Sequence, residues 1–105
     1  NNTSQALELI DHVGHTNFKL NMDTSTLIMN AENMADSILK AGKKISHFHV
    51  SSPNLTPVTG GTINFALINS LLREIEYDGA VSVEMRPTTE KNVEAALQIL
   101  KNNFR

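Results

Sequence analysis

Cysteine is absent from the 105 residues of this chain. Its absence excludes disulfide bonds, thiolate metal sites and cysteine nucleophiles within these residues. A chain without disulfides suits a reducing compartment, and its first residues do not have the pattern of a secretory signal peptide. We therefore expect a cytoplasmic protein.

The sequence also lacks a long apolar run and a strong excess of charge of either sign. No run approaches the roughly 18 apolar residues of a membrane-spanning helix, so we expect no membrane partner. Nine Lys and Arg against eleven Asp and Glu give a net charge of -2. A basic stripe typical of nucleic-acid-binding proteins is missing, so we expect no nucleic-acid partner. The length and the 40% hydrophobic content fit one domain with a modest core.

Two histidines occupy alternate positions in a short apolar stretch at residues 45–52. Ile45, Phe48 and Val50 favour a strand. Successive side chains of a strand point to opposite faces, so His47 and His49 are expected on the same face. Two imidazoles near a strand end can bind a metal, although hydrogen-bonded structural histidines are the more common reason for such a pair. The rest of the chain decides between these interpretations.

Helix and strand patterns alternate along the whole chain. Apolar residues at helical spacing predict four helices, capped at Thr3 or Ser4, at Asn33, at Asn64 and at Thr88 or Thr89. Shorter alternating stretches predict strands at residues 18–23, 45–52 and 80–84. Such strict alternation implies parallel strands joined by right-handed crossovers, and therefore an α/β fold.

Each predicted strand has one side chain near its end that can bind a metal. These residues are Asp23, His49 and Glu84, which are separated by 26 and 35 positions, against about 30 per strand-helix unit of a (β/α)8 barrel. Chemistry in parallel α/β folds takes place at this end of the strands. Two carboxylates and one imidazole are suited to Mn²⁺, Mg²⁺, Co²⁺ or Zn²⁺.

Such a centre can serve carbohydrate chemistry. A divalent ion can bind the adjacent carbonyl and hydroxyl of a sugar and stabilise the enediolate formed when a carbon-bound proton is removed. Glu84 can act as the base if its pKa lies near the working pH. His47 can contact the substrate, or pack as a structural residue. Arg86 can hold a phosphate or carboxylate, or be a solvated loop residue.

Three motifs carry a resemblance to a known family: Asn17-Phe-Lys-Leu-Asn-Met-Asp23-Thr24, Ala41-Gly-Lys-Lys-Ile-Ser-His-Phe-His49-Val50 and Tyr77-Asp-Gly-Ala-Val-Ser-Val-Glu84. With them the sequence resembles the C-terminal part of the xylose isomerase-like TIM barrels. The resemblance is to the sugar phosphate isomerase/epimerase group, which includes ketose 3-epimerases and hydroxypyruvate isomerases. It implies that residues 1–105 are part of a (β/α)8 barrel, with its last three parallel strands alternating with four helices.

The resemblance also implies roles for individual residues. Asp23, His49 and Glu84 would be metal ligands on the sixth, seventh and eighth barrel strands. A fourth ligand, a glutamate of the fifth strand that forms an acid/base pair with the residue matching Glu84, is not in these 105 residues. We therefore expect the isolated chain to be inactive or nearly so. Its unpaired edges, near residues 18–22 and 80–83, are expected to self-associate or to pair with the missing N-terminal barrel portion.

Three positions depart from the family pattern. Thr26 stands where the epimerases often have a substrate-contacting histidine, and Ser51 and Leu55 stand where an acidic residue and an arginine are common. These changes argue against the usual ketose pocket but leave the metal ligands intact. An alternative is a non-catalytic or degenerate barrel domain that binds a small polyol or assembles with partners. A DNA-repair endonuclease of the same superfamily is disfavoured, because it needs further histidine and aspartate ligands.

Overall fold

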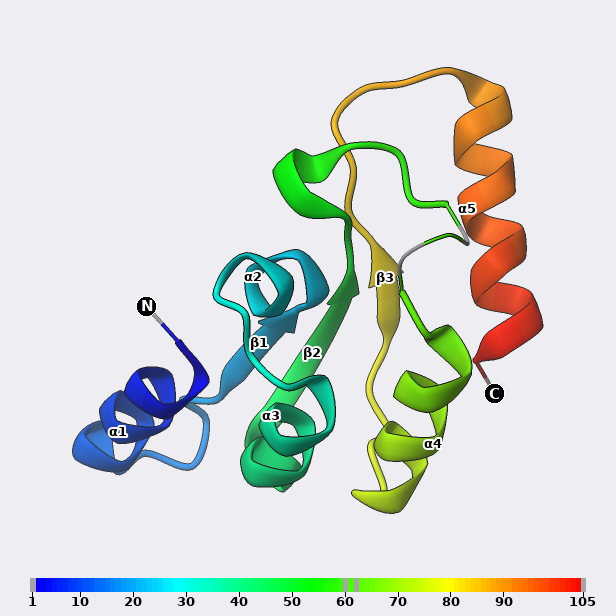
Figure 1. The fold of residues 1–105 in the computed structure, drawn as a ribbon. Helices are drawn as coiled ribbons and strands as arrows, with labels where there is room; N and C mark the ends of the chain where they lie inside the picture. The colour runs from blue at the N-terminus through cyan, green and yellow to red at the C-terminus, as the bar shows by residue number, and fades with distance from the viewer. Residues whose placement is uncertain (1, 60, 62, 105) are drawn as a thin grey trace.

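The computed structural model describes residues 2–59, 61 and 63–104. At its centre is a parallel sheet in the order β1-β2-β3, formed by Leu20–Asp23, Ile45–Val50 and Val81–Val83. Figure 1 shows the helices arranged along this sheet, from α1 beside β1 to α5 beside β3. The three parallel strands confirm the expected α/β class.

Five α-helices connect and flank the strands: α1 (Thr3–Val13), α2 (Thr24–Met29), α3 (Met34–Ala41), α4 (Phe65–Glu74) and α5 (Glu90–Asn103). The side chains of Asn33, Asn64 and Thr89 cap α3, α4 and α5, each accepting a hydrogen bond from a backbone N–H three residues along. Gly14 ends α1 in the left-handed conformation, with φ of 68°. These caps agree with the sequence pattern.

The short helix α2 is one more than the four helices expected from the sequence. It begins directly after β1, because the Asp23 side chain accepts hydrogen bonds from the backbone N–H groups of Ser25 and Thr26. Six residues are too few for a helical period to be recognised in the sequence. The cap of α1 is also different: it is Asn2, just before the two residues expected to cap this helix.

One face of the sheet is apolar and packs against the helices. Met22, Phe48 and Val50 are buried there, in one cluster with Ile38 of α3 and Leu71 of α4. The regular alternation of strand residues places the polar side chains on the other face. This polar face consists of Asn21, Asp23, His47, His49, Ser82 and Glu84.

The register of the sheet brings the polar residues into line. Asp23 is paired with His49, and His49 with Ser82. The backbone N–H of Glu84 donates to the carbonyl of Val50 at 3.0 Å, which extends this alignment past the end of β3. The ends of all three strands therefore lie at the same edge of the sheet.

Helix α5 covers its side of the sheet incompletely. Val93 and Leu97, which the helical pattern assigns to the buried face, are 38% and 50% exposed. They border a hollow of about 630 Å³ beside β3, because no further strand of the described residues pairs with the outer edge of β3. Within the described part of the chain, no helix is long and apolar enough to cross a membrane.

Candidate metal centre

Asp23, His49 and Glu84 converge at the carboxyl ends of the three strands. Each offers one ligand atom, and these atoms all lie within 4.8 Å of one another. The Nδ1 atom of His49 is 3.2 Å from Oε2 of Glu84, so the imidazole and the carboxylate form an ion pair when the histidine is protonated. The three residues that the sequence proposes as ligands are therefore brought together by the fold.

The Asp23 carboxylate is surrounded by donors on one side. Its Oδ1 atom accepts hydrogen bonds from the hydroxyl and the N–H of Ser25, at 2.6 and 2.9 Å, and from the Thr26 N–H at 3.3 Å. The Ser51 hydroxyl donates to the same oxygen. Burial raises the pKa of Asp23, but these hydrogen bonds and one with Glu84 outweigh it and bring the pKa below its ordinary value. Asp23 is therefore ionised at neutral pH.

The donor set fits a divalent ion. Ligand atoms about 2.0–2.2 Å from an ion lie at most roughly 4.4 Å apart when they are on opposite sides of it. The 4.8 Å limit of the observed group is only slightly wider, so small side-chain movements would close it around an ion. Two carboxylates and an imidazole also leave positions free for further oxygen ligands.

The two other candidate site residues are placed differently. His47 lies on the same face as His49, their rings in edge contact with centroids 4.5 Å apart, and its Nε2 atom is 3.4 Å from the Ser82 hydroxyl. Its side chain is exposed and free to meet a ligand. Arg86 donates its backbone N–H to Leu55, while its exposed side chain borders the hollow beside β3. The Arg86 side chain therefore borders the hollow beside β3 and does not lie on the polar face of the sheet.

Sequence reasoning missed the hydroxyl residues that support Asp23. Ser25 and Ser51 bind it directly, and Thr24 joins the ends of β1 and β2: its hydroxyl donates to the Ser51 carbonyl at 2.6 Å and accepts from the Ser51 N–H at 2.8 Å. Thr24 and Ser51 are completely buried. The contacts of Ser51 with Thr24 and Asp23 span 27 and 28 positions, so no local pattern could reveal them. The Ser25 contact spans two positions, and its only signal in the sequence is a hydroxyl residue next to an acidic strand end.

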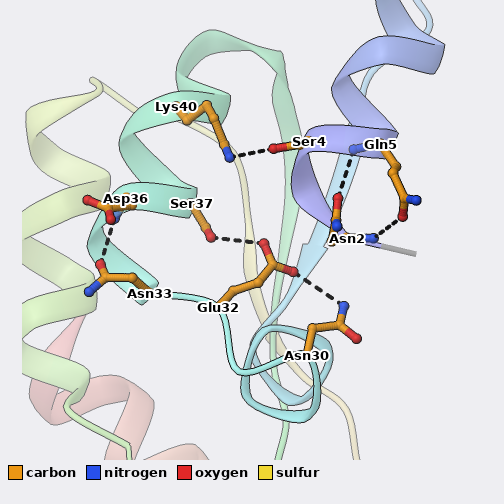
Figure 2. Close-up of a pocket in the computed structure, with 9 residues that line it drawn as sticks. All are labelled: Asn2, Ser4, Gln5, Asn30, Glu32, Asn33, Asp36, Ser37 and Lys40. Carbon is orange, nitrogen blue, oxygen red and sulfur yellow. Dashed lines mark hydrogen bonds between the residues drawn. The ribbon is translucent and has the colours of Figure 1, made fainter.

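A second polar region lies between α1 and α3, and none of the three candidate ligands lines it. It is a hollow of about 400 Å³ centred on Glu32 and Ser37, shown in Figure 2. Both Glu32 oxygens accept hydrogen bonds: Oε1 from the Thr3 N–H and the Ser37 hydroxyl, and Oε2 from the same N–H and from Asn30. Burial raises the pKa of Glu32, but these bonds lower it below its ordinary value. Glu32 therefore fastens the N-terminus of α1 to α3.

Comparison with known proteins identifies the family. The family described as "Xylose isomerase-like TIM barrel" matches residues 1–103. The chain belongs to this family. The match agrees with the parallel sheet and with the resemblance carried by the three sequence motifs.

Curated relatives in the xylose isomerase-like family are sugar enzymes. A D-psicose 3-epimerase of Enterocloster bolteae is 33% identical over 84 residues, which is 80% of this chain and 28% of the epimerase. The hydroxypyruvate isomerase of Escherichia coli is 29% identical over 88 residues, 83% of this chain and 34% of the isomerase. The chain thus spans less than a third of the length of the first epimerases it matches.

Solved structures agree on the fold. A D-psicose 3-epimerase crystallised in the presence of D-fructose superposes with a TM-score of 0.85 at 24% identity, covering 98% of this chain and 44% of that one. An L-ribulose 3-epimerase superposes with a TM-score of 0.74 at 25% identity, covering 100% and 36%. The fold of this chain therefore corresponds to part of a larger barrel.

Proposed function

We propose that residues 1–105 form the C-terminal portion of a barrel enzyme, a metal-dependent isomerase or epimerase of sugars or sugar phosphates. The observation that carries the proposal is the convergence of Asp23, His49 and Glu84 within 4.8 Å at the carboxyl ends of parallel strands. The epimerase and isomerase relatives support the reaction class. The isolated portion is expected to have little or no activity.

Asp23, His49 and Glu84 would hold a divalent ion, which can be Mn²⁺, Mg²⁺, Co²⁺ or Zn²⁺ from the donor set. A bound ion would act as a Lewis acid that polarises the carbonyl and hydroxyl oxygens of the sugar. The ionised state of Asp23 favours this, since its pKa is held below the ordinary value by hydrogen bonds that outweigh burial. A carboxylate that is already deprotonated binds an ion without first losing a proton.

Glu84 is the proposed base. It would remove the proton from the carbon next to the sugar carbonyl, and the electrons of the broken C–H bond would pass to the carbonyl oxygen to give an enediolate. The contact between Glu84 and His49 orients the carboxylate toward the polar face. Epimerisation further requires a second acid/base group that returns a proton to the opposite side. That group would come from the barrel strands outside these residues.

His47 and Arg86 are proposed to bind the substrate. His47 is exposed on the polar face, and its ring contacts the ring of His49, one of the three candidate ligands. Its imidazole can donate to a sugar hydroxyl. Arg86 follows Glu84 by two residues and borders the hollow beside β3, where its guanidinium can meet an anionic group such as a phosphate.

The open edges of the sheet point to a structural partner. The edges of β1 and β3 are unpaired within the described residues, and the exposed Val93 and Leu97 beside β3 offer apolar surface. We expect these edges to be closed by the N-terminal part of the barrel, or by self-association when that part is missing. A cytoplasmic location remains a prediction from the sequence.

The alternative is a barrel domain that binds a small polyol without turning it over. Two features favour it: Thr26 and Leu55 replace a histidine and an arginine that the resemblance implies for a ketose pocket. Such a domain would keep the ion but lack the groups that hold a ketose in a reactive position.

Solvent exchange separates the two functions. The purified full-length protein, loaded with Mn²⁺, would be incubated in D₂O with ketoses such as fructose and psicose, and with hydroxypyruvate. An isomerase or epimerase would introduce deuterium at the carbon next to the carbonyl, detected by proton NMR. A protein that binds Mn²⁺ but exchanges no carbon-bound proton in any of these compounds would contradict the enzymatic proposal and support the polyol-binding domain.

A further inference from the structure

The hydrogen bonds that serine and threonine residues donate to Asp23 all end on one of its two carboxylate oxygens. Oδ1 accepts from the Ser25 hydroxyl, the Ser25 N–H, the Thr26 N–H and the Ser51 hydroxyl. A carboxylate oxygen has about two lone pairs, so Oδ1 is fully occupied. Among the described residues, no backbone N–H and no Ser or Thr hydroxyl donates to Oδ2. The further hydrogen-bond partner of the Asp23 carboxylate is Glu84, a candidate ligand of the same ion. Oδ2 is therefore the oxygen that remains for a cation.

The direction of the Ser51 hydroxyl is fixed by its own partners. Its oxygen accepts a hydrogen bond from the Ser25 N–H at 3.2 Å, so its single proton is directed at Asp23. The backbone of Ser51 is fixed in turn, because Thr24 binds both its N–H and its carbonyl. Ser51 is completely buried, which keeps water from competing with these bonds.

We propose that Ser25 and Ser51 are positioning residues that make Asp23 a one-oxygen ligand. They hold Oδ1 away from the ion and present Oδ2 alone to the space shared with His49 and Glu84. A carboxylate that bound through both oxygens would occupy one more coordination position. The serines therefore preserve a position for a substrate oxygen. This inference rests on the proposed metal centre and adds a role for two hydroxyls to it.

The test is a calorimetric titration with Mn²⁺ of the purified full-length protein and of three serine variants. Partners that orient a metal ligand typically change ion affinity by about 10–100-fold, so Ser25→Ala and Ser51→Ala are each expected to weaken binding about 10-fold. The control is Ser52→Ala. Ser52 is also buried and next in sequence, but its hydroxyl caps no helix and does not bind Asp23. Its variant should bind Mn²⁺ within about 2-fold of the wild type, because it leaves the hydrogen bonds to Asp23 intact.

A second measurement reports the coordination itself. Co²⁺ in place of Mn²⁺ absorbs visible light more weakly as its coordination number rises. If Asp23 binds through both oxygens once a serine is removed, the absorption per Co²⁺ of Ser25→Ala and Ser51→Ala should fall. Ser25→Thr keeps a hydroxyl and should restore both the affinity and the spectrum. Ser51 is more deeply buried than Ser25, so Ser51→Ala is the variant more prone to unfold. If it does unfold, the comparison of Ser25→Ala with Ser25→Thr still tests the proposal.

The outcomes distinguish the two levels of the proposal. A wild-type protein that binds neither ion would overturn the metal centre, and with it the role of the serines. A wild type that binds Mn²⁺, with alanine variants of equal affinity and spectrum, would overturn the positioning role alone. An equal loss in Ser52→Ala would also overturn it, because the effect would then follow from disturbing any buried serine.

Discussion

Asp23 and Glu32 are two neighbouring carboxylates that differ in which of their oxygens accept hydrogen bonds. Both border the small hollow beneath the start of α1. Both have a pKa below the ordinary value, because hydrogen bonds outweigh burial. Glu32 has donors on both oxygens, whereas the donors to Asp23 are gathered on Oδ1. A lowered pKa alone therefore does not separate a structural carboxylate from a candidate ligand.

The groups around each carboxylate distinguish the structural one from the candidate ligand. Glu32 contacts the first turn of α1 and the side chain of Ser37, and its negative charge suits the positive end of the helix dipole. Asp23 has one oxygen left over and lies beside His49 and Glu84. A carboxylate with a free oxygen facing other ligands is a candidate for metal binding, and a saturated one is a structural clamp.

Replacing the proposed base should have the largest effect. Glu84→Gln removes a proton acceptor and should lower the isomerase or epimerase rate by about 10²–10⁴-fold. The matched control Glu32→Gln makes the same chemical change in the structural carboxylate and should keep the rate within a few-fold. Steady-state assays of the full-length protein measure both. Equal losses in the two variants would contradict the assignment of Glu84.

Removing the charge of Asp23 should come next. Asp23→Asn keeps the shape of the side chain but replaces the carboxylate of a candidate ligand with a neutral amide. Divalent-ion affinity should therefore fall by about 100-fold, the upper end of the range known for groups that orient metal ligands. Calorimetric titration with Mn²⁺ reads the change. Glu32→Gln, titrated alongside, should bind the ion as the wild type does. An Asp23→Asn protein with undiminished affinity would show that the ion binds elsewhere.

The structural carboxylate should in turn control stability. Glu32→Gln weakens the hydrogen bonds that join α1 to α3 and should lower the free energy of unfolding by about 1 kcal/mol. The folded-state pKa of Glu32 lies below its ordinary 4.5. Its contribution is therefore present above that pH and lost as the pH falls through the folded-state pKa. Urea unfolding at pH 7 and pH 3 should show a difference between wild type and variant that shrinks in acid.

A difference that stayed constant between pH 7 and pH 3 would contradict the role of the Glu32 charge. The pKa of Asp23 is also lowered, but Asp23 is present in both proteins, so the difference between them isolates Glu32.

The smallest effect is expected at His47. His47→Ala removes an exposed imidazole that contacts His49 and Ser82 but is not among the three candidate ligands. Loss of one hydrogen bond to substrate corresponds to about 0.5–1.5 kcal/mol, so KM should rise up to about 10-fold with little change in Mn²⁺ affinity. Kinetics at saturating Mn²⁺ measure this. An unchanged KM would assign His47 a packing role instead.

The sequence predicted the parts of the molecule that depend on local periodicity. The three strands and the caps at Asn33, Asn64 and Thr89 follow from residue type and spacing. The meeting of the candidate ligands was also predictable, because parallel strands end at one edge of a sheet. Once the strands were recognised, His47 and His49 could be placed on one face, because they are two residues apart in the same strand.

Features that depend on distant contacts were not predictable. The Ser51 hydroxyl reaches Asp23, 28 positions away in the sequence, only because β1 and β2 are paired. Leu97 has the spacing of a buried residue, yet it is half exposed because the surface it faces belongs to no described strand. Periodicity reports which side of a helix is apolar, but not what lies against that side.

The most direct test of the account is a crystal structure of the full-length protein grown with Mn²⁺, measured at a wavelength where manganese scatters anomalously. We predict one anomalous peak within bonding distance of Asp23, His49 and Glu84, with Asp23 contributing Oδ2. Glu32 should have no peak. A peak at Glu32, or none near the three strand ends at saturating Mn²⁺, would contradict the central claim that the free oxygen of Asp23 belongs to a metal centre.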